Sequence, residues 1–252
     1  MKFSFIIPSF NQGKFIKQTI DSILFQDVEK EIIVMDGGST DETIEILKSY
    51  GDKIYWVSEK DNGQTDAINK GIKKATGEII AYINSDDYYL NGVLKIVEKY
   101  FSDNSDFLWL TGDGIIVNEN GDVIQKPVSL YKRLWRKITF FWTIYITNFI
   151  IQPSTFFRRE VFDKIGLFDE NRHYTMDYDF WLRLYKKGYR PLIINEKISA
   201  FRIHSFSKGG SKFMEQFKED FDTLKRYCSN PFLKFLHWFH NNLIVLVYLL
   251  VK

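Results

Sequence analysis

Two adjacent carboxylates, Asp86 and Asp87, follow an apolar run at residues 79–83 that is typical of a buried strand. Acids at the end of a core strand repel each other and lose hydration, so this position is unfavourable for them. A hard divalent cation such as Mg²⁺ or Mn²⁺ would offset that penalty, because it binds oxygen ligands and bridges to phosphates. The alternative is a solvated turn, in which Asp and Ser are common. The choice depends on what else gathers around the pair.

Polar clusters follow three of the four strands that we predict in the first hundred residues. These strands are expected at residues 3–8, 31–35, 54–57 and 79–83, with helical patterns between them. The alternation predicts an α/β fold with a mostly parallel central sheet flanked by helices. The polar clusters at 8–11, 36–39 and 84–87 would then meet at the carboxyl edge of the sheet, where ligands bind. A nucleotide pocket with a metal ion fits that shared edge.

The composition narrows the class of protein. A chain of 252 residues with 45% hydrophobic residues can bury a sizeable core, and a net charge of +2 gives no argument for nucleic-acid binding. The single cysteine, Cys228, cannot form an internal disulfide, which fits a reducing compartment. Met1 and Lys2 lead directly into the first predicted strand without a signal peptide, so we expect the active part to face the cytoplasm.

The order and spacing of the motifs resemble glycosyltransferase family 2, over roughly residues 3–205. The matching segments are FIIPSFN at 5–11, IIVMDGGSTD at 32–41, DNGQTDAINKG at 61–71, NSDD at 84–87, QPSTFFRR at 152–159 and MDYDFWLRL at 176–184. The resemblance implies the GT-A fold of nucleotide-diphospho-sugar transferases. Each motif alone is weak evidence, whereas the ordered set is strong.

The resemblance implies a nucleotide site at the first three motifs. Asp36 has acceptors suited to the uracil imide N–H, and Pro8 and Phe10 would border the base. Asp66 and Asn69 lie one helical turn apart and would present one face to the nucleotide, although a solvated helix face is equally consistent with their spacing. The nucleotide-binding residues expected in this way are Pro8, Phe10, Asn11, Asp36, Gly38, Ser39, Asp66, Asn69 and Ser85.

The resemblance also implies the metal site. Asp86 would hold Mg²⁺ or Mn²⁺ against the sugar diphosphate, and Asp87 would be a second ligand or a contact to the donor sugar. The family commonly has an acid where this chain has Asn84, which points to a smaller ligand set. His204 would complete the metal shell or contact the diphosphate, although a lone histidine is more often structural.

Asp177 is the expected general base and Asp179 is the second candidate. Both lie at the start of a predicted helix, where acids also occur simply because they compensate the helix dipole. The family usually has a Glu where this chain has Met176, yet Asp177 stays in register. A base at Asp177 would deprotonate an acceptor hydroxyl that attacks the anomeric carbon, which inverts its configuration. A retaining route would need a nucleophile that we cannot nominate.

We expect a catalytic domain at residues 1–228, with a nucleotide-binding half at 1–105 and an acceptor-side half at 106–228. Residues 131–137 are basic and residues 138–157 are uncharged, which suits contact with anionic lipid, a buried helix or a flap over the acceptor. Residues 229–252 form an apolar tail interrupted by two histidines and two asparagines, so an interfacial helix is favoured over a membrane span. A helix packed on the domain and a homodimer seam are the alternatives.

The expected activity is metal-dependent, inverting transfer of a sugar from a UDP-linked donor to a saccharide or lipid-linked acceptor, in cell-surface polysaccharide or glycan synthesis. The enzyme would be peripheral on the cytoplasmic face of the membrane. A nucleotidyltransferase and a catalytically inactive sugar-binding protein are the alternatives; residues 9–13 lack the basic, Gly-rich phosphate loop of the first, and the retained acids disfavour the second. No Gly-x-Gly-x-x-Gly or Gly-x-x-x-x-Gly-Lys motif supports a dehydrogenase or a P-loop enzyme.

Overall fold

The computed structural model describes residues 1–138, 142–205 and 213–251. The strands are β1 (Phe3–Ser9), β2 (Lys30–Asp36), β3 (Tyr55–Ser58), β4 (Ile79–Tyr82), β5 (Tyr88–Tyr89), β6 (Trp109–Val117), β7 (Val123–Ile124), β8 (Thr155–Arg158) and β9 (Leu192–Arg202). The helices are α1 (Gly13–Leu24), α2 (Thr43–Ser49), α3 (Gln64–Lys74), α4 (Val93–Asp103), α5 (Lys126–Lys137), α6 (Glu160–Ile165), α7 (Met176–Lys186), α9 (Phe213–Tyr227) and α10 (Pro231–Val251). Short 3₁₀ turns occur at Gly51–Lys53, Thr143–Tyr145 and Gln152–Ser154.

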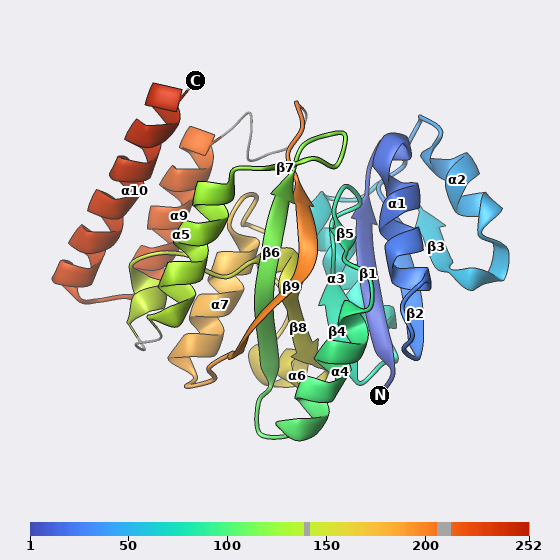
Figure 1. The fold of residues 1–252 in the computed structure, drawn as a ribbon, viewed down its shortest axis with the longest axis horizontal. Helices are drawn as coiled ribbons and strands as arrows, with labels where there is room; N and C mark the ends of the chain where they lie inside the picture. The colour runs from blue at the N-terminus through green and yellow to red at the C-terminus, as the bar shows by residue number, and fades with distance from the viewer. Residues whose placement is uncertain (139–141, 206–212, 252) are drawn as a thin grey trace.

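One mixed sheet of the order β3-β2-β1-β4-β8-β6-β9-β5 runs through the molecule, with β7 paired to β6 (Figure 1). The predicted α/β fold is confirmed, and β1 to β4 are parallel as the alternation indicates. Beyond β4 the sheet is mixed, because β8 pairs antiparallel with both β4 and β6. β6 and β7 pair antiparallel. Residues 192–202 form one long strand, β9, whose pairing with β6 is irregular around Asp113.

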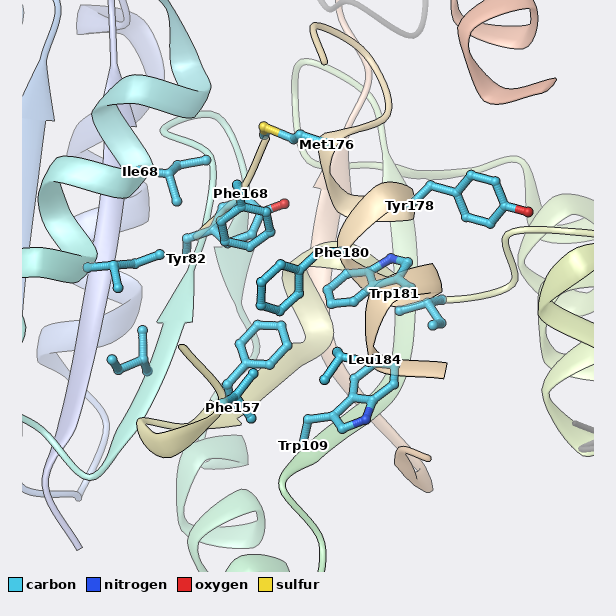
Figure 2. Close-up of a cluster of buried hydrophobic side chains, with 14 of the residues drawn as sticks. Ile68, Tyr82, Trp109, Phe157, Phe168, Met176, Tyr178, Phe180, Trp181 and Leu184 are labelled. Carbon is cyan, nitrogen blue, oxygen red and sulfur yellow. The ribbon is translucent and has the colours of Figure 1, made fainter. Parts of the chain in front are cut away.

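The parallel strands bury side chains on both faces, as their uninterrupted apolar runs require. On β1, Phe3, Phe5 and Ile7 face the core beneath α1 and α4, whereas Ile6 faces the core beneath α3 and α7. On the α7 side the core is largely aromatic, with Trp109, Phe157 and Trp181 stacked on one another (Figure 2).

The register of the parallel strands brings their ends together. Ser9 lies opposite Asp36 in the pairing of β1 with β2, and β4 continues into residues 83–87 beside the end of β1. The loops that follow β1, β2 and β4 therefore share one edge of the sheet, as the polar clusters predict.

The C-terminal tail is helical, and one face of it packs on the domain. His237 of α10 is fully buried, stacks on Tyr178 of α7 and on Phe221 of α9, and lies 2.5 Å from Asp220. Asn241 also donates to Asp220. In the described part of the chain, each helix falls short of the length or the apolar character that a membrane crossing requires.

The opposite face of α10 is exposed and apolar. It carries Phe232, Phe235, Trp238 and Phe239 on successive turns. The uncharged stretch at 138–157 behaves differently: its described part forms 3₁₀ turns and β8, buries Ile144, Phe149 and Ile150, and contains no α-helix. Residues 139–141 of that stretch lie outside the described residues.

Candidate active site

A cleft of about 710 Å³ lies at the carboxyl edge of β1 and β4 and is walled by both halves of the chain. Of the residues predicted from the sequence, it is lined by Pro8, Phe10, Ser85, Asp86, Asp177 and His204. The remaining predicted residues are not part of its lining: Asn11, Asp36, Gly38, Ser39, Asp66, Asn69, Asp87 and Asp179. The predicted set therefore divides into side chains that face the cleft and side chains that support its walls.

The first group of side chains that faces the cleft is the pair of Asp86, which follows β4, and His204, which follows β9. Nε2 of His204 lies 2.9 Å from Oδ2 of Asp86. The guanidinium of Arg202 donates to the backbone oxygens of Asp86 and Glu119, at 2.8 Å in each case, and to Oε1 of Gln18. Because Arg202 is buried and precedes His204 by two residues, it holds both ends of the pair in place.

Asp86 and His204 can take part in a divalent metal site but cannot complete one. No group of three or more His, Cys, Asp or Glu side chains in the described residues could hold a metal ion. Mg²⁺ is nevertheless commonly bound by one or two carboxylates together with substrate phosphates and water. The one carboxylate and one imidazole here fit that arrangement, with a diphosphate supplying the other oxygens.

Asp87 does not face the cleft, although the sequence nominates it as a metal or donor-sugar ligand. Its side chain is fully buried, and its carboxylate accepts from the backbone N–H of Arg202 at 2.8 Å and from Nδ2 of Asn84 at 3.2 Å. Burial raises the pKa of Asp87 well above its usual range, and the neighbouring charge of Asp86 adds to the rise. In this arrangement Asp87 ties the loop after β4 to the end of β9.

The second facing group is Asp177, in the first turn of α7. Its carboxylate accepts from the N–H of Tyr178 at 2.7 Å and is partly exposed to the cleft. Burial raises the pKa of Asp177 to about 6, against the opposing hydrogen bond from Tyr178 and the charge of Lys132. The charge of Asp220 adds to the rise. A carboxylate with a pKa near neutrality suits a general base.

Asp179 lies on the same turn but points into the protein. It is fully buried, accepts from Nε of Arg183 at 2.9 Å, and accepts from the hydroxyl of Tyr227 at 2.6 Å. Two residues along a helix face different directions, which is why the pair cannot share the cleft. Asp177 therefore faces the cleft, whereas Asp179 forms a buried ion pair with Arg183.

Asp36 stabilises the loop after β2 through hydrogen bonds and does not face the cleft. The buried Asp36 carboxylate accepts from the N–H groups of Gly38 and Ser39, and from the hydroxyls of Ser39 and Ser58, at 2.5–3.1 Å. Gly38 has φ +87°, which glycine adopts without strain. Asn11 joins the same loop, since it accepts from Thr40 and its N–H donates to Ser39. These residues shape the cleft wall from behind Pro8 and Phe10.

The face of α3 that carries Asp66 and Asn69 does not meet the cleft. Asp66 accepts from the N–H of Asn62 at 3.0 Å and pairs with Lys70. Asn69 exchanges two hydrogen bonds with the backbone of Phe168, each 3.0 Å long, and therefore clamps α3 to the opposite half of the chain. Gln64 and Ala67 line the cleft instead, and the side chain of Gln64 donates to Asn84.

Most of the lining residues were not nominated from the sequence, and Ser9, Gln64, Tyr82 and Gln152 are among them. Three of these four residues lie inside the quoted motifs. The sequence therefore located them but did not show which way their side chains point. The sequence pattern predicts that Tyr82 is a core residue, because it belongs to the apolar run of β4. Only the alternation of β4, with Ala81 on one face and Tyr82 on the other, distinguishes it.

Comparison with known proteins agrees with this geometry. Residues 4–166 match the family model described as Glycosyl transferase family 2. An uncharacterized glycosyltransferase of Rickettsia prowazekii is 34% identical over 209 residues, which cover 80% of this chain and 64% of that protein. The poly(ribitol-phosphate) beta-N-acetylglucosaminyltransferase TarS of Staphylococcus aureus is 27% identical over 206 residues, 78% of this chain and 35% of TarS. The chain thus spans less than two thirds of the length of these relatives.

Two solved structures share the fold. S. aureus TarS 1–349 in complex with UDP-GlcNAc superposes with a TM-score of 0.67 at 22% identity, over 93% of this chain and 69% of that one. The mannosyltransferase PcManGT from Pyrobaculum calidifontis, in complex with GDP-Man and Mn²⁺, superposes with a TM-score of 0.71 at 19% identity, over 94% of this chain and 68% of that one. The predicted GT-A fold is confirmed.

Proposed function

This chain belongs to glycosyltransferase family 2, and from that premise we propose that it moves a sugar from a UDP-linked donor to a saccharide or lipid-linked acceptor, with inversion at the anomeric carbon. The observation that supports this most strongly is the convergence of Asp86, His204 and Asp177 on one cleft. The structure of TarS with UDP-GlcNAc supports the choice of nucleotide. Synthesis of cell-surface polysaccharide or glycan is the setting that we propose.

Asp177 is the general base in this proposal. It accepts the proton of the acceptor hydroxyl while that oxygen forms a bond to the anomeric carbon. The bond from that carbon to the diphosphate breaks, and its electron pair leaves with the diphosphate. The raised pKa of Asp177 matches this task, since a base that titrates near the working pH is strong enough to take the proton and is still largely ionised.

Asp86 and His204 are the proposed protein ligands of Mg²⁺ or Mn²⁺. When bound, the ion would stabilise the negative charge that develops on the leaving diphosphate. The presence of Mn²⁺ in the PcManGT structure supports a divalent ion in this fold. Arg202 fixes the backbone of Asp86 and so keeps the carboxylate beside the imidazole of His204.

Pro8, Phe10 and Ser85 are the proposed contacts of the nucleotide. Phe10 is 59% exposed although it is a large aromatic side chain, and it lies at the cleft. An exposed ring beside a pocket offers a stacking surface for a base. Asp36, Asn11, Gly38 and Ser39 would act on the nucleotide through the shape of their loop.

We also propose that residues 1–228 form the catalytic domain and that the exposed face of α10 lies on a membrane surface. Phe235, Trp238 and Phe239 give that face an aromatic character suited to the interface between water and lipid. Lys137, at the exposed end of neighbouring α5, adds a cation that suits anionic lipid. A lipid-linked acceptor would be presented at such a surface. A homodimer that covers the same face is the alternative.

A thermal-shift screen tests the proposed donor. A ligand that binds only the native state raises the melting temperature, by an amount that grows with its concentration relative to Kd. UDP-sugars should raise the melting temperature of this protein more than GDP-sugars do, and more with Mn²⁺ than with EDTA. The Asp86→Ala variant is the matched control and should lose the Mn²⁺-dependent part. Equal shifts for all nucleotides, or none, would contradict the proposal.

A further inference from the structure

The hydroxyl group of Tyr82 is a feature of the cleft that the proposed mechanism does not use. Tyr82 is the last residue of β4, lines the cleft, and is 3% exposed. Its hydroxyl oxygen is buried and has no hydrogen-bond partner in the described residues. Buried polar groups in proteins are almost always paired, so an unpaired hydroxyl in the wall of a binding cleft points to a partner supplied by the ligand.

The surroundings of Tyr82 hold its ring in one position. The ring meets Phe168 edge-on, with the centroids 5.3 Å apart, and its backbone oxygen accepts from Nε2 of Gln152 at 2.8 Å. Figure 2 shows the ring between β4 and the segment that leads into α7, close to Phe168 and Met176. A ring that is fixed in this way presents its hydroxyl in a defined place and loses little freedom when a ligand binds.

The hydroxyl is also in the correct protonation state to donate. Burial raises the pKa of Tyr82 well above its usual range, and the carboxylates of Asp177 and Asp87 raise it further. The phenol therefore keeps its proton at any pH at which the enzyme would work. Tyr82 lies close to Met176, which directly precedes Asp177 in the chain, so its ring is on the side of the cleft where the proposed base is found (Figure 2).

We propose that the Tyr82 hydroxyl donates a hydrogen bond to an oxygen of the sugar bound beside Asp177, and so positions that sugar for transfer. This inference rests on the proposed function of the cleft. A sugar oxygen at this place could belong to the donor sugar or to the acceptor saccharide. The chemistry is the same in both cases, and the kinetic parameters distinguish the two sources.

The test is Tyr82→Phe, which removes one oxygen atom and keeps the ring. Loss of one hydrogen bond between neutral groups should raise one KM by roughly 3- to 10-fold. A rise in the KM for the nucleotide sugar, seen also in donor hydrolysis without acceptor, assigns the contact to the donor sugar. A rise in the acceptor KM alone assigns it to the acceptor.

Tyr89→Phe is the matched control. The Tyr89 hydroxyl is also buried and unpaired in the described part of the chain, but Tyr89 packs on Phe5 and Phe156 on the other face of the sheet, outside the cleft lining. Both variants should melt at or slightly above the temperature of the parent protein, because neither loses a protein hydrogen bond. Only Tyr82→Phe should change a KM.

Unchanged kinetic parameters for Tyr82→Phe, within the error set by Tyr89→Phe, would overturn the inference. A loss of melting temperature in Tyr82→Phe alone would also overturn it, since it would reveal a partner inside the protein. Neither outcome would contradict the proposed function, which requires only that the parent enzyme transfers sugar. If the parent showed no transfer with any donor, the proposed function itself would fail, and binding of UDP-sugars to the two variants would still test the contact.

Discussion

The acids around the cleft have two contrasting environments. Behind the lining of the N-terminal half, Asp36 and Asp66 accept hydrogen bonds from backbone N–H groups of their own loops. On the C-terminal wall, Asp177 faces the cleft with a raised pKa. An acid enclosed by N–H donors stabilises a loop, whereas an acid that is desolvated with few donors is available for proton transfer. The surroundings of a carboxylate thus indicate its role better than its place in a motif does.

Asp177→Asn sharpens this comparison most, and we expect the largest effect from it. Asn has nearly the same shape but cannot take a proton, so transfer should fall by about 10²- to 10⁴-fold. Donor binding should be retained, because the change lies away from the proposed metal ligands. Single-turnover transfer and the thermal shift caused by the donor measure the two quantities. Transfer within threefold of the parent rate would remove Asp177 from the mechanism.

Asp179→Asn is the contrasting variant on the same turn of α7. It weakens a buried ion pair with Arg183 and a hydrogen bond from Tyr227. We expect a loss of about 1–3 kcal/mol in the free energy of unfolding, with transfer by the remaining folded enzyme close to normal. Urea denaturation and activity per folded molecule check this. A folded Asp179→Asn protein that binds donor but transfers nothing would reverse the two assignments.

Asp86→Ala tests the metal side of the cleft, and Asp87→Asn is its control. Asp86→Ala should abolish the stimulation of donor hydrolysis by Mn²⁺ while the melting temperature without ligand stays near that of the parent. Asp87→Asn should lower the melting temperature instead, because the buried carboxylate accepts from the N–H of Arg202. Full metal-stimulated hydrolysis in Asp86→Ala would refute the proposed ligand role.

The pH dependence of transfer should report the ionisation of Asp177 on the C-terminal wall. A general base must be ionised, so kcat/KM should rise about tenfold per pH unit below the pKa of Asp177 and level off above it. Since burial raises that pKa to about 6, the rise should lie near pH 6 and not near pH 4. The profile of Asp177→Asn should lose this step. A profile of the parent enzyme that is flat between pH 5 and 7 would disagree with the assigned base.

The smallest effect is expected at the exposed face of α10. The double change of Trp238 and Phe239 to serine should weaken co-sedimentation with vesicles that contain anionic lipid. Transfer to a soluble acceptor should change less than twofold, because neither side chain lines the cleft. Changing exposed Phe25, which lies at the end of α1, to serine is the control. Unaltered sedimentation, together with a change from dimer to monomer, would favour a seam between two copies.

The fold was largely predictable because its determinants are local. The apolar runs of β1, β2 and β4, and the helices between them, follow from periodicity, and the right-handed parallel connection follows from the alternation. The mixed second half was not predictable in the same way. Whether β8 pairs antiparallel with β4 depends on contacts between residues about 80 positions apart, such as Ile79 with Arg158, which no local pattern encodes.

The site was predictable at the level of motifs but not of individual side chains. The motifs located the cleft, and Asp86, Asp177 and His204 do face it. Asp87 and Asn69 point elsewhere, because their partners, Arg202 and Phe168, come from distant segments. The direction of a side chain at a loop or a helix start depends on such partners, and a single sequence does not reveal them.

The packing of α10 has a practical consequence for anyone who wishes to shorten the protein. The exposed apolar face of α10 makes residues 229–252 an obvious target for deletion. The inner side of that helix, however, covers Tyr178, which directly follows Asp177, and His237 also contacts Asp220 nearby. We expect a shortened enzyme to lose packing behind Asp177, the proposed base, and so to become more soluble but less active.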